Sequence, residues 1–191
     1  MSAIKGRAWV FGDNLDVDFE IVPYRIVSEL ELASLFDDEE KRILSEETLG
    51  RYCMTAVDPD FPKKVRKGDI IVAGTNMGCG HDHATGPQAI KGCGVEAVIA
   101  ESLTDWFLRN CINVGLLAIQ YEGIKKEVKE GDELKIDVRS GKLTNLTTNK
   151  KMEFKPLPDF ILEIIEAGGL VSHIMKRIEN GELCDPIRNT I

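Results

Sequence analysis

The stretch DIIVAGTNMGCGHDHATGPQAIKGC, residues 69–93, decides the fold predicted for this chain. It begins with an apolar run typical of a buried parallel strand and ends with a short helical pattern opened by Pro87. The glycine-rich turn between the two holds His81 and His83. Such a turn directs backbone N–H groups and the positive end of a helix dipole toward one place. We therefore predict that the backbone of residues 78–80 binds an anion and that the imidazoles transfer protons near neutral pH.

The same alternation of strand and helix continues along the chain. Apolar runs at residues 97–100 and 116–119 follow helical patterns at residues 87–93 and 103–111, and a further strand is predicted at residues 5–11. This order implies parallel strands joined by right-handed crossovers. Ligands of open α/β sheets bind beyond the carboxyl ends of the strands, which is where the histidine turn falls.

The pattern changes after residue 119. Residues 133–138 alternate apolar and polar side chains, and turn sequences at residues 140–141 and 147–150 predict a β-meander. Helical patterns at residues 160–167 and 170–179 are separated by two glycines. The predicted fold class is α/β, with a partly parallel sheet flanked by helices and a C-terminal β-meander followed by helices.

A chain of 191 residues fits one domain with a sizeable core. We predict a domain over residues 1–179 and a loosely held C-terminal tail over residues 180–191. Residues 26–54 are acidic and helical in pattern, without Pro and without Gly until Gly50. This segment is predicted to be a helical insertion or lid.

Composition excludes several classes of partner. The net charge of −8 argues against nucleic-acid binding, because phosphate neutralisation needs clustered Lys and Arg. No apolar signal-peptide core opens the chain, and no stretch approaches the roughly 18 apolar residues of a membrane span. We expect a cytoplasmic protein with no membrane partner. Five cysteines, an odd number, indicate free thiols rather than a disulfide framework.

The residues of the histidine turn are open to three interpretations. Flanking glycines leave the imidazoles unshielded and Asp82 is near enough to fix a tautomer, so His81, Asp82 and His83 are candidate catalytic residues. Cys79, His81 and His83 occupy alternate positions and could instead ligate a metal, although they supply only three ligands. The two histidines could also have a purely structural role in the turn.

Several motifs, in order and with similar spacing, resemble the small subunit of 3-isopropylmalate dehydratase from residue 6 to residue 177. The matching segments are residues 11–18, 23–25, 58–61, 68–74, 76–80, 107–116, 157–160 and 166–169. The resemblance implies the swivelling β/β/α domain of the aconitase superfamily. It also implies a large partner subunit in which three cysteines hold a [4Fe-4S] cluster that acts as a Lewis acid on the substrate. This chain itself is expected to hold no cofactor or metal.

The sequence departs from the family pattern in the catalytic loop. After Gly-Cys-Gly the family usually reads Ser-Ser-Arg-Glu, where the first serine is the base and the arginine binds a substrate carboxylate. Here His81, Asp82, His83 and Ala84 stand at those positions. We expect His81 to replace the base and His83 to replace part of the arginine's charge. The candidate substrate-binding residues are Asp16, Asp18, Arg25, Gly78, Cys79, Gly80 and Arg109.

The leading hypothesis is a hydro-lyase (dehydratase) subunit, active only with its large [4Fe-4S] subunit, that acts on a malate-like 2-hydroxy dicarboxylate, as in leucine biosynthesis. Because the family serine and arginine are missing, a non-catalytic swivel subunit that binds and regulates a large partner is the alternative. A free-standing metalloenzyme using Cys79, His81 and His83 is a third hypothesis. Dependence on a large partner predicts exposed apolar surface and self-association of the isolated chain. The sequence does not name the hydroxyacid.

Overall fold

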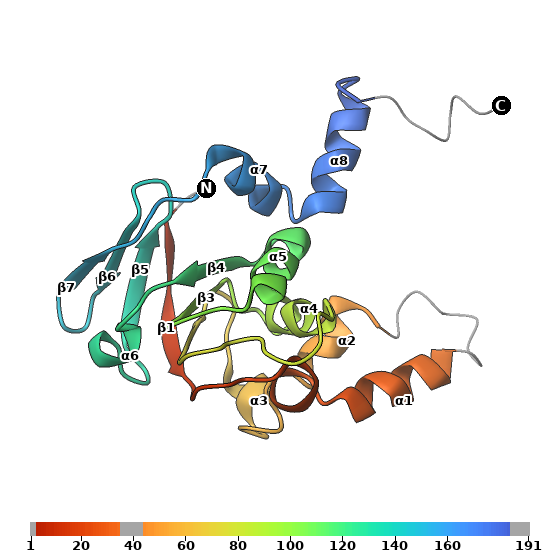
Figure 1. The fold of residues 1–191 in the computed structure, drawn as a ribbon, viewed down its shortest axis with the longest axis horizontal. Helices are drawn as coiled ribbons and strands as arrows, with labels where there is room; N and C mark the ends of the chain where they lie inside the picture. Colours follow the sequence, from red (N-terminus) through yellow and green to blue (C-terminus); the bar gives the residue numbers. More distant parts are fainter. Residues whose placement is uncertain (1–2, 35–43, 184–191) are drawn as a thin grey trace.

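The computed structural model describes residues 3–34 and 44–183. Residues 35–43 of the predicted insertion and residues 184–191 of the predicted tail lie outside the described residues. In the described part, seven strands form one sheet in the order β4-β3-β2-β1-β5-β6-β7 (Figure 1). The strands are β1 (Ile4–Val10), β2 (Ile70–Ala73), β3 (Ala97–Ala100), β4 (Leu117–Gln120), β5 (Glu133–Asp137), β6 (Lys142–Asn145) and β7 (Lys150–Glu153).

The sheet is parallel in one half and antiparallel in the other. Strands β1 to β4 are parallel neighbours, with Ala8 opposite Ile70 in the register of β1 and β2. Strand β5 pairs antiparallel with the other edge of β1 and continues into the β5-β6-β7 meander. The predicted parallel alternation and the predicted meander are both confirmed.

Strands β2 and β3 are buried along their whole length and β4 except at Gln120, which explains their continuous apolar runs. Side chains alternate along each strand, so Ile71 and Val98 belong to one core cluster while Ile70 and Val72 belong to a second. Helices cover the first face. The second face is closed by the meander, because Leu143 and other inward residues of β5 to β7 share its core. The sheet therefore curls over itself, and the meander covers its second face together with the helical residues Ile124, Leu162 and Ile165 (Figure 1).

Eight α-helices and one π-helical turn connect the strands of the described chain. They are η1 (Val17–Ile21), α1 (Tyr24–Ser34), α2 (Glu46–Gly50), α3 (Phe61–Lys64), α4 (Thr85–Gly92), α5 (Asp105–Val114), α6 (Ile124–Glu127), α7 (Asp159–Glu166) and α8 (Leu170–Glu179). The longer helices carry local start and stop signals. Helix α5 begins where the Thr104 side chain accepts the Phe107 N–H and ends at Gly115, whose φ is 80°. The turn η1 and the short helices α3 and α6 were not predicted, because four or five residues do not show a helical period.

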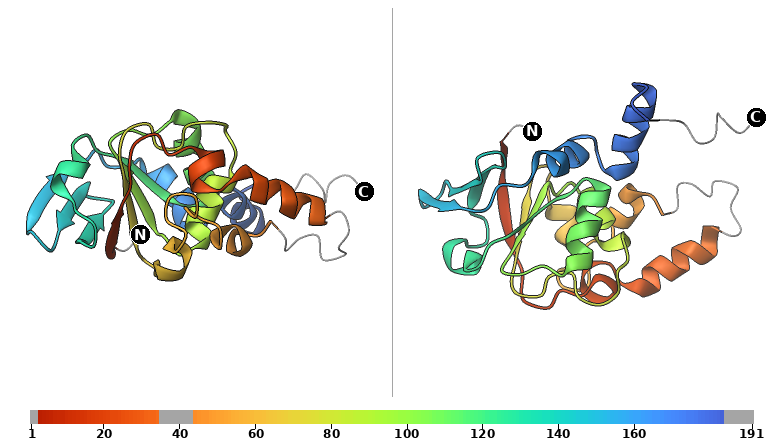
Figure 2. Two further views of the ribbon diagram at one scale, coloured as in Figure 1. Left: turned by 90° about the horizontal axis from the view of Figure 1, so that it is seen from below. Right: turned by 45° about the horizontal axis from the view of Figure 1, so that its top comes forward.

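The two ends of the segment predicted as an insertion or lid, residues 26–54, pack differently. Helix α1 projects from the body, as both views in Figure 2 show. Leu49, Cys53 and Met54, in contrast, are fully buried in the helix-side core. A Cβ on Gly92 of α4 would lie 1.7 Å from the Glu46 carbonyl oxygen, so α2 and α4 are in backbone contact. The segment from residue 44 to residue 54 therefore packs as part of the helix-side core.

Helix α8 also projects from the body, on the side opposite α1 (Figures 1 and 2). None of its residues is buried, and the apolar side chains of Val171, Ile174 and Met175 are exposed. This exposed apolar surface agrees with the expectation from the sequence. Within residues 3–34 and 44–183, no helix has the length and apolar character needed to cross a membrane.

Candidate active site

Two loops meet at the carboxyl ends of the first two parallel strands. The loop that follows β1 holds the acidic residues, and the loop that follows β2 holds the histidines. Backbone hydrogen bonds join the two loops: the Asn14 N–H donates to Thr75 O (2.8 Å) and the Val17 N–H donates to Cys79 O (2.9 Å). The predicted position of the histidine turn beyond the strand ends is confirmed.

Gly78 and Gly80 allow this close approach. Their φ angles are 77° and 89°, in the left-handed region that favours glycine. A Cβ on Gly78 would lie 2.1 Å from Cγ of Phe107, and a Cβ on Gly80 would lie 2.4 Å from Oδ2 of Asp16. The Gly78 N–H already donates to Leu15 O at 2.9 Å. The Gly78 N–H is thus occupied and an acidic side chain lies against Gly80, while anion binding by the backbone of residues 78–80 stays a prediction.

The central feature of the site is one carboxylate that contacts two imidazoles. Oδ2 of Asp18 lies 2.7 Å from Nδ1 of His81, and Oδ1 of Asp18 lies 2.9 Å from Nδ1 of His83. The two rings are stacked, 5.4 Å apart at their centroids with an interplanar angle of 12°. The Asp18 side chain is 7% exposed, whereas those of His81 and His83 are 76% and 43% exposed. A buried acceptor thus anchors two solvent-facing rings.

Asp18 is held by the turn η1. The Asp18 N–H donates to Oδ1 of Asp16 (2.8 Å), which caps the turn, and the Asp16 N–H donates to Oε2 of Glu20 (2.9 Å). Val17 and Ile21 of the same turn are buried in the core. The backbone of Asp18 is therefore fixed on both sides, and its carboxylate is aimed at the histidine loop.

Asp82, predicted to fix the tautomer of the imidazoles, contributes its backbone rather than its side chain to the contacts of the loop. The carboxylate that contacts the two rings is Asp18, which the sequence separates from them by more than 60 residues. Asp82 contributes its backbone carbonyl, which accepts a hydrogen bond from Nδ2 of Asn110 (2.8 Å). This contact ties the loop to α5.

Two aromatic side chains flank His81 and His83 and were not predicted from the sequence as part of the site. The ring of Tyr24 stacks on His83 with centroids 6.0 Å apart. Trp106 is exposed and lines a hollow of about 250 Å³ together with Gly80, His81 and Asp82. The sequence around Tyr24 and Trp106 gives no sign that these side chains lie beside the histidine loop. Their position depends on how α1 and α5 pack in the folded chain.

The two candidate arginines lie on the helices that carry these aromatic residues. Arg25 follows Tyr24 in α1, is exposed, and has its Nε 3.8 Å from Oε1 of Glu29. Arg109 is exposed on α5, three residues after Trp106. Among the described residues, neither arginine makes a hydrogen bond or ion pair with the carboxylate or the rings of the histidine pair. Both arginines therefore lie on helices that border the site, α1 and α5, but neither makes a polar contact with Asp18 or the two rings.

The residues of this site do not form a metal centre by themselves. Burial, followed by the negative charge of Asp16, raises the pKa of the Cys79 thiol, which disfavours the thiolate that binds metals. Asp18 engages Nδ1 of both His81 and His83, so only the Nε2 atoms of these rings could bind a metal. In the part of the chain that the structure describes, no group of three His, Cys, Asp or Glu side chains is arranged to hold a metal ion. The proposed ligand set of Cys79, His81 and His83 is therefore not supported.

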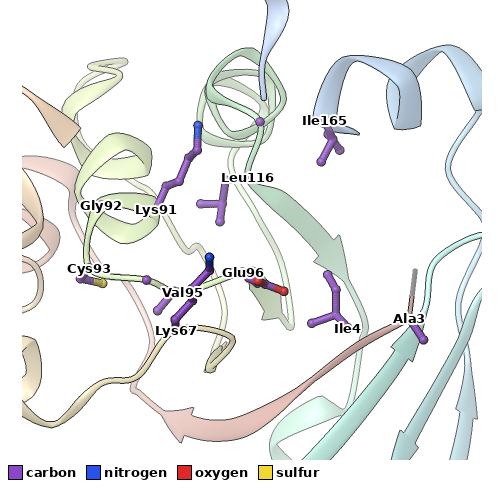
Figure 3. A pocket seen from close by; sticks show the side chains of 12 residues that line it. Ala3, Ile4, Lys67, Lys91, Gly92, Cys93, Val95, Glu96, Leu116 and Ile165 are labelled. Carbon is purple, nitrogen blue, oxygen red and sulfur yellow. The ribbon is translucent and has the colours of Figure 1, made fainter. Parts of the chain in front are cut away.

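A second cavity, of about 610 Å³, lies at the amino ends of the parallel strands (Figure 3). Lys67, Lys91 and Glu96 border it, and Ile165 of α7 faces it from the other side. The Lys91 ammonium already donates to Oε1 of Glu46, Val114 O and Gly168 O. Because the Lys91 ammonium is already engaged in these contacts, the cavity is a weaker candidate for the active site than the histidine loop.

The curled sheet, the helix-covered parallel half and the histidine loop at the strand ends define an α/β domain of the aconitase type. The Aconitase C-terminal domain family matches residues 31–124. The "isopropylmalate/citramalate isomerase small subunit" of Methanocaldococcus jannaschii is 43% identical over 181 residues, covering 95% of this chain and 99% of the relative. The "methanogen homoaconitase small subunit" of Methanothermobacter thermautotrophicus is 43% identical over 178 residues, covering 93% and 94%.

A solved structure shows the same fold. The crystal structure of 3-isopropylmalate dehydratase from Methanocaldococcus jannaschii superposes with a TM-score of 0.80 at 38% identity, covering 95% of this chain and 100% of that one. This chain belongs to the family of 3-isopropylmalate dehydratase small subunits, within the aconitase superfamily. The resemblance stated from the sequence motifs is confirmed.

Proposed function

We propose that this chain is the small subunit of an iron–sulfur-dependent hydro-lyase that acts on a malate-like 2-hydroxy dicarboxylate. Its relatives are named as small subunits of isopropylmalate/citramalate isomerase, homoaconitase and 3-isopropylmalate dehydratase, and isopropylmalate and citramalate are both 2-hydroxy dicarboxylates. The observation that supports activity rather than a purely regulatory role is the pair of exposed imidazoles on the buried Asp18, at the catalytic loop of the family. A loop without a catalytic role would not need two aligned proton acceptors.

The cluster belongs to the large partner subunit in this proposal. This division of labour between two chains is what membership of the family implies. When bound in the partner, the cluster supplies a Lewis acid that polarises the departing hydroxyl group. The histidine loop then has to face the partner, and the exposed Trp106 beside His81 lies at the rim of that contact.

His81 is proposed as the base. It is the more exposed of the two rings, and it stands at the family position of the catalytic serine. Its Nε2 would accept the proton from the carbon next to a substrate carboxylate, and it would return that proton when water is re-added. His83 would bind a substrate carboxylate in place of the missing arginine, and Tyr24 and Arg25 of α1 would meet the substrate's side chain.

The test is co-expression with the large subunit, anaerobic reconstitution of the cluster, and a panel of 2-hydroxy acids that includes isopropylmalate, citramalate, dimethylmalate and homocitrate. Double-bond formation is followed by ultraviolet absorbance. We expect turnover of at least one acid, and a loss of about 100-fold or more in kcat for His81→Ala. His173→Ala, a histidine of α8 outside the loop, is the matched control and should retain activity.

Two results would count against the proposal. Full activity of His81→Ala would remove His81 as the base. No turnover across the panel, with the complex formed and the cluster intact, would reject the hydro-lyase proposal and leave the non-catalytic subunit as the better explanation.

A further inference from the structure

We propose that Asp18 is a positioning residue that holds His81 and His83 in the same tautomer, so that the pair acts as a twin proton acceptor. The sequence suggested that Asp18 binds a substrate carboxylate. The structure instead has both of its oxygens engaged, one by each ring, at 2.7 and 2.9 Å. A buried carboxylate that already contacts two rings is not available to a substrate, and its negative charge would repel a substrate carboxylate.

The hydrogen-bonding chemistry of the two groups fixes the tautomer. An ionised carboxylate can only accept hydrogen bonds, so the Nδ1 atom of each ring has to carry the hydrogen. A neutral imidazole has one N–H, which leaves Nε2 of His81 and Nε2 of His83 both as unprotonated acceptors. One side chain therefore prepares two bases at once.

The arrangement of the rings aligns these acceptors. Both Nδ1 atoms lie on one carboxylate and the ring planes differ by 12°, so both Nε2 atoms are on the side away from Asp18. That side is the solvent-facing one, because the rings are exposed while the carboxylate is buried. The two acceptors thus face the same outer space, where His81 borders the hollow beside Trp106.

The two rings have different neighbours, which divides their roles. His83 stacks on Tyr24, whose ring face stabilises a nearby cation, whereas His81 adjoins the open hollow. This division rests on the proposed function: Nε2 of His81 accepts the proton from the substrate carbon, whereas Nε2 of His83 first accepts a proton from solvent and then donates it in a hydrogen bond to a substrate carboxylate. The tautomer assignment itself does not depend on that function.

Nitrogen-15 NMR of the full chain with labelled histidine tests the assignment without the large subunit. At an alkaline pH where the rings are neutral, two-bond nitrogen–proton couplings distinguish N–H at Nδ1 from N–H at Nε2. Signals of the three histidines are assigned with the single variants His81→Gln, His83→Gln and His173→Gln. We expect both His81 and His83 to carry the hydrogen at Nδ1. Either ring carrying it at Nε2 in the unmodified protein would overturn the proposal.

Asp18→Asn gives a second, sharper prediction. An asparagine amide has one acceptor oxygen and one donor NH2 group, so it can accept from only one of the two rings. One ring should keep its hydrogen at Nδ1 and the other should change to the Nε2–H tautomer. Asp16→Asn is the matched control, since Asp16 contacts the Asp18 backbone and neither ring, and it should leave both tautomers unchanged. If Asp18→Asn left both rings with Nδ1–H, the carboxylate would not be what sets the tautomer.

Activity in the reconstituted complex separates this proposal from the proposed function. Asp18→Asn should lower kcat by roughly 100-fold with a smaller change in KM, and Asp18→Glu should recover part of the loss. If the tautomers are as expected but no acid is turned over by the unmodified complex, the positioning role stands and the hydro-lyase proposal fails. If turnover occurs and Asp18→Asn is fully active, the positioning role is rejected while the hydro-lyase function stands.

Discussion

Asp69 is expected to be a major source of stability at the end of the sheet opposite the histidine loop. It precedes β2 and is 5% exposed. Its Oδ2 accepts hydrogen bonds from Nε1 of Trp9 (2.8 Å), the Arg66 N–H (3.0 Å) and the guanidinium of Arg7 (3.1 Å). That guanidinium lies over the Trp9 ring, 4.4 Å from its centroid. One carboxylate thus joins β1 to the segment that leads into β2.

The substitution Asp69→Asn should destabilise the protein by about 3 kcal/mol. Removing one partner of a buried charged pair costs about 3–5 kcal/mol. Arg7 is one-third exposed and asparagine retains the shape and one acceptor oxygen, which puts the cost at the lower end of that range. For a chain of this size, about 3 kcal/mol corresponds to a fall in Tm of roughly 6–12 °C.

The effect should depend on pH. Burial raises the pKa of Asp69, but the hydrogen bonds from Trp9, Arg66 and Arg7 outweigh it, so the pKa in the folded state is lowered. A lowered folded-state pKa gives stability that is fully present above the unfolded-state pKa, about 3.9, and is lost as pH falls below it. The difference in the free energy of unfolding between wild type and Asp69→Asn should therefore shrink as the pH is lowered through about 4.

Urea unfolding measures this difference. Trp9 is the fluorescence reporter in a Trp106→Phe background, since Trp106 is exposed and would obscure its signal. Asp159→Asn, which removes an exposed ion pair with Arg139, is the control and should leave the urea midpoint unchanged. A cost below about 1 kcal/mol for Asp69→Asn, or a cost that does not shrink at acid pH, would refute the argument.

Two further results are expected. The substitution Gly78→Ala places a Cβ against Phe107 at a φ of 77° and should lower the free energy of unfolding by about 3 kcal/mol. The control Gly12→Ala has nothing within 4 Å of its Cβ and should leave Tm nearly unchanged in a thermal melt. Equal Tm values for the two variants would contradict this prediction. The hydrogen bond from Cys53 lowers the pKa of the Cys93 thiol, whereas burial raises the pKa of the Cys53 thiol. Iodoacetamide should therefore label Cys93 well before Cys53 at mildly alkaline pH, as measured by peptide mass spectrometry. Equal labelling of the two thiols would contradict this order of reactivity.

Much of the fold could be predicted because its strands and helices follow from residue patterns that are local in the sequence. Continuous apolar runs predicted strands at residues 70–73 and 97–100 within a residue of their observed bounds. Period-two alternation predicted β5 (Glu133–Asp137), and paired glycines marked the break between α7 and α8. Each of these signals arises within a few residues of the element it specifies, so no knowledge of distant contacts is needed.

The segment from residue 44 to residue 54 shows where local patterns fail. Its acidic neighbourhood suggested an exposed insertion, yet Leu49, Cys53 and Met54 are fully buried. Helix α2 has only five residues and therefore no apolar period to read. Its burial depends on the glycine contact with α4, which the sequence separates from it by about 40 residues.

Glycines, histidines and apolar runs are short-range signals, so they were enough to predict the α/β class, the family and the loop that carries the candidate chemistry. The internal organisation of that loop depends on contacts between distant parts of the chain. The tertiary structure brought Asp18 to both His81 and His83, and it left Asp82 to support the loop through its carbonyl. The reason is physical: hydrogen bonds between loops at the ends of β1 and β2 set these distances, and their partners lie more than 60 residues apart in the chain.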